Sequence, residues 1–221
     1  MTTLNTPRGP AAADRSAQGA ARLERWYGLV DAISFIGLLN LLIIAFTLAG
    51  GIVLGWAPAL SAATVCSRRR LRGDGQRLVR AFAAHWRGRF AHANLLAASP
   101  AAALAGLGVG IAALSDGGPG LLVGALYAAG AVCLAHLLLT LTMDSHYELA
   151  RARCVRLAWT FLVRFPGAPL LLTATTVLVA AITALVPGLL PVVSIGAWAY
   201  LCTALCLSFY AANDRNLPTE A

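Results

Sequence analysis

Charge is scarce in this sequence, and lysine is missing from it. Charged residues make up 12% of the 221 residues, about half of the share that is usual in a soluble domain. All seventeen basic residues are arginine. Hydrophobic residues make up 59% of the chain, and its mean hydropathy is +0.73. These values exclude an ordinary soluble domain and indicate an integral membrane protein.

Motifs of catalysis and nucleotide binding are also missing. The sequence has no P-loop, no HExxH, no GxSxG and no paired carboxylates within an apolar run. We therefore expect no enzyme activity, no cofactor and no metal site. The five cysteines fall in apolar runs or beside arginine-rich loops, so we expect no disulfide framework. Cys202 and Cys206 lie one helical turn apart and could share a soft metal, but small buried apolar residues are the simpler interpretation.

The arginines are concentrated between long apolar runs. Eight of them lie between Cys66 and His92, and loops rich in Lys or Arg are retained on the cytoplasmic side of a membrane during insertion. The net charge of +8 therefore indicates topology control and contact with anionic lipid headgroups. Nucleic-acid binding is not expected.

The apolar runs predict an all-α, polytopic fold with one transmembrane domain over residues 21–216. Residues 1–20 are predicted to be a disordered cytoplasmic tail, and residues 217–221 a second short tail. The first apolar run spans about 38 residues, whereas one pass needs about 20, and Gly50-Gly51 interrupts it. We expect six passes, the second one short, with five as the alternative, at about 29–48, 52–66, 93–114, 119–143, 167–187 and 189–210.

The distribution of arginine favours six passes over five. If the loops 66–92 and 144–166 lie inside, both short turns between the later passes lie outside and the C-terminus lies inside. A hairpin formed by the first two passes keeps the N-terminal tail inside as well, so that every arginine is on one side. Five passes would place that tail outside. The expected orientation is therefore N-in and C-in.

The arginine-rich segment also carries an apolar stripe opposite a basic face. Large apolar residues recur every four positions, and arginines fall on the other side of the predicted helix. Such a helix could lie on the inner leaflet or dock on a cytosolic partner. His85 and His92 are expected to be solvated or at headgroups. The candidate docking residues are Leu78, Phe82, Trp86, Phe90, Arg77, Arg80 and Arg87.

Few polar residues fall within the predicted passes, and each is a functional candidate because polar groups are costly in hydrocarbon. The amide of Asn40, at mid-depth, is predicted to hydrogen-bond another helix. His136, Thr140 and Asp144 share a helix face at i, i+4 and i+8 spacing. They could form a proton path, but a single contact followed by the polar end of a pass is the simpler interpretation.

Other residues at the ends of passes suggest weaker sites. Asp31 is expected to be interfacial and to pair with Arg25. Asp144, His146 and Glu148 form the single cluster near one interface that could serve an enzyme acting on lipid-linked substrates. The small residues Gly106, Gly110 and Gly124 are predicted to allow close helix packing.

Several short motifs together resemble the YesL-type family of bacterial membrane proteins. They are Trp26-Tyr27, LLNLL at 38–42, PALSAA at 58–63, GDG at 73–75, Arg89-Phe90 and RFP at 164–166. The resemblance extends over about residues 22–216. It implies a protein of the bacterial cell membrane that is encoded near carbohydrate ABC transporters, without established activity or assigned functional residues.

Three functions are compatible with these observations. An accessory or scaffold component associated with carbohydrate uptake, with ABC transporter subunits as partners, fits best. A small transporter or channel acting as a homo-oligomer would need polar residues along several passes. A membrane enzyme acting on lipid-linked substrates would depend on the cluster that contains Asp144.

Overall fold

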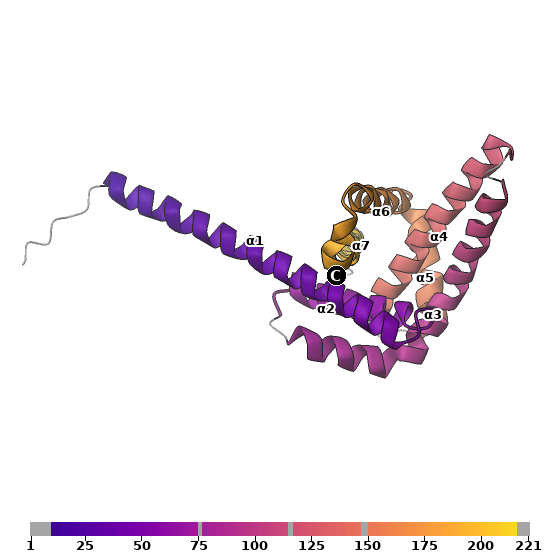
Figure 1. Cartoon of the computed structure of the whole chain (residues 1–221), viewed down its shortest axis with the longest axis horizontal. Coiled ribbons are helices and arrows are strands. Elements are labelled where there is room, and N and C mark those ends of the chain that lie inside the picture. Colours follow the sequence, from indigo (N-terminus) through magenta and orange to yellow (C-terminus); the bar gives the residue numbers. More distant parts are fainter. Residues whose placement is uncertain (1–9, 75–76, 115–116, 147–149, 216–221) are drawn as a thin grey trace, which may run out of the picture.

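The structure, a computed structural model, describes residues 10–74, 77–114, 117–146 and 150–215. Within these ranges the chain forms helices and no strand, so the predicted all-α fold is confirmed (Figure 1). A 3₁₀ turn, η1 (Pro187–Leu189), and a π-helical turn, η2 (Leu190–Ser194), connect the last two α-helices. The α-helices are α1 (Pro10–Ala49), α2 (Trp56–Leu71), α3 (Leu78–Leu114), α4 (Gly120–His146), α5 (Arg151–Arg164), α6 (Gly167–Leu185) and α7 (Ile195–Arg215).

Five helical segments of the described chain are long and apolar enough to cross a membrane. They are Glu24–Ala49, Leu78–Leu114, Gly120–Ser145, Gly167–Leu185 and Pro187–Asn213. Helix α2 is not among them, because it has 16 residues and carries three arginines in its last turn. By length and composition alone, the described helices give five candidate passes, the number expected as the alternative, and the short pass predicted at 52–66 falls mainly on α2.

Helix α2 crosses α4 instead of running along it. Ala57, near the start of α2, packs in one cluster with Leu137 and Leu141 of α4. Near the other end of α2, Arg68 donates a hydrogen bond to the carbonyl oxygen of Ser145. Between these two places α2 advances about three turns, and α4 advances about one turn from Leu141 or two from Leu137, so the two helices are inclined to each other. Helix α2 thus lies obliquely on α4 and adds a buried layer to the protein.

A tight turn reverses the chain between α1 and α2. Gly51 has a φ of 77° and Ile52 a φ of 53°, a region that side chains with a Cβ rarely adopt. A Cβ on Gly50 would collide with the backbone of Gly55, and one on Gly55 would collide with that of Thr47. The Gly50-Gly51 interruption is therefore the point at which the chain turns back.

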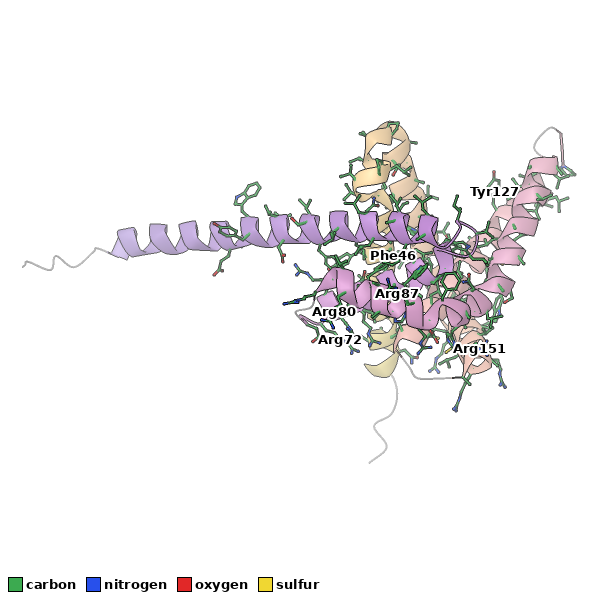
Figure 2. All side chains as sticks on the ribbon, turned by 60° about the horizontal axis from the view of Figure 1, so that its bottom comes forward. Phe46, Arg72, Arg80, Arg87, Tyr127 and Arg151 are labelled. Carbon is green, nitrogen blue, oxygen red and sulfur yellow. The ribbon has the colours of Figure 1, made fainter. Side chains whose placement is uncertain are left out.

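Helix α1 begins earlier than predicted. It starts at Pro10, so residues 10–20, predicted to be a disordered tail, are helical. Alanine is the best helix former, and proline is favoured in the first turn of a helix; both are present here. The N-terminal part of α1 projects away from the other helices (Figures 1 and 2). The tails predicted at 1–9 and 217–221 lie outside the described residues.

The predicted cytoplasmic loop 66–92 is largely helical. Helix α2 continues to Leu71 and α3 begins at Leu78, so the pass predicted at 93–114 is the second half of a 37-residue helix. Helix α3 bends along its length (Figure 1) and contains Pro100, which removes a backbone hydrogen bond and so favours a bend. Its second half forms a projecting arm with α4.

The apolar stripe of α3 is part of the core of the protein. Leu78 is 9% exposed and Phe82 is fully buried, in a cluster with residues of α1 and α2. The ring of Phe46 lies 5.2 Å from the rings of both Phe82 and Trp86, and Trp86 lies 4.9 Å from Phe90. The prediction that Leu78 and Phe82 dock on lipid or on a partner is therefore wrong, because both side chains are buried within the protein. Helical periodicity identifies an apolar face but not the surface that covers it.

Close helix packing occurs at a glycine other than those predicted. A Cβ on Gly106 or Gly124 would meet nothing within 4 Å, and one on Gly110 would meet only the side chain of Leu126, at 3.6 Å. A Cβ on Gly196 of α7 would instead collide with the carbonyl oxygen of Ile36 in α1. The tight contact between helices is therefore that of α1 with α7.

Candidate functional site

Asp144, near the end of α4, is the carboxylate around which charged side chains gather. Its side chain is 4% exposed. One carboxylate oxygen, Oδ1, lies 2.8 Å from Nε2 of His92 and 3.5 Å from Nη1 of Arg89, both on α3. A buried carboxylate is costly unless it is paired, and here α3 supplies two partners. The pairing ties the first half of α3 to the end of α4.

Helix α2 extends this set of contacts. Nε2 of His85 lies 3.0 Å from Oγ of Ser61, and Arg68 reaches the carbonyl oxygen of Ser145, the residue after Asp144. Burial, followed by the nearby charges of Arg72 and Arg69, lowers the pKa of the Arg68 guanidinium. We refer to Ser61, Arg68, His85, Arg89, His92 and Asp144 as the polar cluster.

Most residues of the polar cluster carry no signal in the sequence that points to a shared site. His85 and His92 were predicted to be solvated or at headgroups, which is wrong, because both are half-buried between helices. The first half of α3 packs on α1 and α2, and this packing brings the histidines inside. No sequence pattern connects His92 with Asp144, since 52 positions separate them.

The predicted face of His136, Thr140 and Asp144 is not a row of mutual contacts. Thr140 donates a 2.7 Å hydrogen bond to the carbonyl oxygen of His136 within α4. The ring of His136 stacks on Trp159 of α5, with centroids 4.5 Å apart. Its Nδ1 is buried and has no hydrogen-bond partner in the described part of the chain. The side chains of His146 and Glu148 lie outside the described residues.

Asn40 connects α1 with the irregular start of α7. Its Nδ2 donates to the carbonyl oxygens of Leu190, at 3.2 Å, and Pro191, at 2.7 Å. Its Oδ1 accepts a 2.9 Å hydrogen bond from the N–H of Gly196. The amide thus satisfies backbone groups where the helix is irregular and proline supplies no N–H. This arrangement suits packing more than ligand binding.

Asp31 forms an ion pair other than the one expected. Its carboxylate pairs with Arg70 of α2 and not with Arg25. The guanidinium of Arg70 also lies 5.5 Å from the ring centroid of Phe35 in α1. The return of α2 along α1 brings these side chains together, which spacing within α1 could not indicate.

A groove of about 590 Å³ lies between α6 and the start of α7. The polar groups in its wall are paired with each other. Nε1 of Trp198 donates to Oγ1 of Thr176 at 2.9 Å, and Oγ1 of Thr183 donates to Oγ of Ser194 at 2.7 Å. The groove is otherwise apolar. The described residues contain no group of three or more His, Cys, Asp or Glu side chains that could hold a metal ion.

Exposed arginines surround the polar cluster on the outside. Figure 2 shows Arg72, Arg80 and Arg87 at the end of α2 and along the first half of α3, and Arg151 at the start of α5. Arg77, Arg80 and Arg87 of the predicted docking set are all exposed. The basic face of that prediction is therefore accessible, although its apolar face is not.

Long apolar helices with charged side chains paired between them define this chain as a multi-pass α-helical membrane protein. Residues 36–111, about a third of the chain, match the model of a family described as a protein of unknown function, DUF624. The match runs from the second half of α1 through α2 and most of α3. No curated protein and no solved structure matches the chain.

Proposed function

We propose that this protein is an accessory, scaffold-type subunit of the bacterial cell membrane that works with an ABC transporter for carbohydrates and is not itself an enzyme. The match of residues 36–111 to DUF624 and the motifs that resemble the YesL-type family support this proposal. That resemblance implies an association with carbohydrate uptake.

The pairing of Asp144 is the observation that carries the scaffold role. Its buried carboxylate is engaged by His92 and Arg89 of the same chain. A charge that is satisfied internally suits the holding of helices in register. The amide of Asn40 is engaged in the same way.

Anionic lipid headgroups are the second partner in this proposal, and α5 is the element that suits them. Arg151, Arg153 and Arg156 are exposed on this helix, together with Trp159, 45% exposed, and Val163, 81% exposed. A helix that exposes arginine beside large apolar side chains fits the boundary between headgroups and acyl chains.

Co-purification from the native host in a mild detergent tests the accessory role. A tagged protein is expected to recover permease or ATPase subunits of a carbohydrate transporter in stoichiometric amounts, identified by mass spectrometry. Recovery of the protein alone would contradict the proposal.

A small transporter that acts as a homo-oligomer is the second candidate. The observation in its favour is the buried Nδ1 of His136, which lacks a described partner, because unpaired polar groups within membrane helices often mark transport paths. Proton flux into liposomes that contain the purified protein would support this candidate if His136→Ala abolished the flux. Absence of flux would leave the accessory role as the better account.

A further inference from the structure

We infer that an outward face formed by Arg77, the residue before α3, and by Arg80 and Arg87 of its first half binds an acidic segment of a partner protein in the aqueous phase. This inference builds on the proposed accessory role and names the surface through which that role is exercised.

The three arginines form one continuous stripe. At 100° per residue they fall within about 80° of one another on the helix. Ala84 and Ala91 lie in the same stripe and are exposed. A Cβ on the neighbouring Gly88 would meet nothing within 4 Å, so the surface between the arginines is open to a partner.

The arginines of the stripe have no partner within the part of the chain that the structure describes. The ion pairs found there use Arg70, Arg89 and His92. Arg77, Arg80 and Arg87 are exposed and belong to none of these pairs. The stripe is thus an uncompensated positive surface, which attracts anionic partners over a distance.

The burial of the opposite side of α3 favours a protein over a lipid surface as the partner of the arginine stripe. A helix that lies on a membrane inserts its apolar face among the acyl chains, but Leu78 and Phe82 are buried against α1 and α2. The arginines therefore point away from the apolar body of the protein. Helix α5 differs in degree, since it exposes Trp159 and Val163 beside its arginines, whereas the first half of α3 exposes Val79.

An acidic peptide segment matches the stripe in length and charge. From Arg77 to Ala91 the helix rises about 21 Å, the span of about six or seven residues of extended chain. Guanidinium groups form strong, charge-assisted hydrogen bonds with carboxylates. Glutamate or aspartate side chains along such a segment can therefore meet all three arginines.

Peptide binding by the full chain tests this inference. The protein is placed in nanodiscs of phosphatidylcholine, and binding of a fluorescein-labelled octaglutamate peptide is measured by anisotropy at low ionic strength. The triple variant Arg77→Gln, Arg80→Gln, Arg87→Gln is expected to bind about tenfold more weakly, the sum of three modest exposed pairs. The control variant Arg25→Gln, Arg164→Gln, at exposed arginines outside the stripe, is expected to change affinity by less than about twofold.

Two results would overturn the inference. One is an equal affinity change in the triple variant and the control variant, provided that both unfold at the wild-type temperature. The other is unchanged octaglutamate binding by the triple variant together with weaker binding of its nanodiscs to phosphatidylserine vesicles, because lipid headgroups would then be the ligand of the stripe. Since the probe is a synthetic peptide, failure of this test is distinct from failure to co-purify a transporter.

Discussion

His92 of α3 lies 2.8 Å from Asp144 of α4, although 52 positions separate the two residues in the chain. The hairpin of α3 and α4 brings them together, and Arg89 joins them from one turn earlier in α3. His92 lies within residues 36–111, which match the family model, and Asp144 lies beyond them. The bond therefore joins the matched segment to a part of the chain outside it. The end of α4 is thereby tied to the part of the chain that matches the family.

Replacement of Asp144 by alanine should destabilise the protein. It leaves Arg89 and His92 partly buried without their carboxylate, and we expect the free energy of unfolding to fall by about 1–3 kcal/mol. Tryptophan fluorescence during unfolding in detergent measures this change. Asp31→Ala is the control, because its carboxylate is 62% exposed and the pair should contribute about 0–1 kcal/mol. Equal effects would show that the Asp144 pair has no special role.

Replacement of Gly196 by alanine should separate α7 from α1. The added Cβ would collide with the carbonyl oxygen of Ile36 and the backbone nitrogen of Asn40, and backbone atoms cannot turn aside. We expect a loss of about 1–3 kcal/mol in unfolding free energy. Gly106→Ala, at an open position, should be neutral or stabilise by up to about 1 kcal/mol. A stable Gly196→Ala protein would contradict the close contact.

The buried thiol of Cys66 should make stability fall at alkaline pH. Burial raises its pKa from 9.0 to about 11, against a smaller opposing effect of Arg69. Below about pH 9 the thiol is protonated in both states. As pH rises from 9 to 11 the unfolded chain releases the proton first, so stability declines, by up to about 2 kcal/mol. In Cys66→Ala the decline should be shallower, and an unchanged slope would exclude Cys66 as its cause.

The side of the membrane on which Glu24 lies separates five passes from six. A cysteine introduced at Glu24, which is exposed, should react with a membrane-impermeant maleimide in intact cells if α1 is the first of five passes. A cysteine at Arg156 should react only after permeabilisation, because arginine-rich segments stay inside. If both positions are labelled only after permeabilisation, the result supports six passes and the N-in orientation that the distribution of arginine predicts.

Local features were predictable because their physical causes lie within a few residues. Apolar runs of membrane length predicted the long helices, and Gly50-Gly51 predicted the break between α1 and α2. The four-residue spacing from Leu78 to Phe90 predicted an amphipathic helix, which is the first half of α3. The start of α1 at Pro10 differs from the predicted tail, because the alanines of residues 10–20 favour a helix in spite of the proline and glycine beside them.

The sequence alone determined that this is an all-α membrane protein, because hydrophobicity and helical periodicity are properties of neighbouring residues. Tertiary structure decided which surfaces meet. Only the fold shows that the apolar stripe of α3, which includes Leu78 and Phe82, packs on α1 and α2. It also shows that α2 crosses α4 and that His92 pairs with Asp144. Apolar side chains gain similar energy against lipid or protein in a membrane, so burial there depends on the three-dimensional fit of helices and not on hydrophobicity.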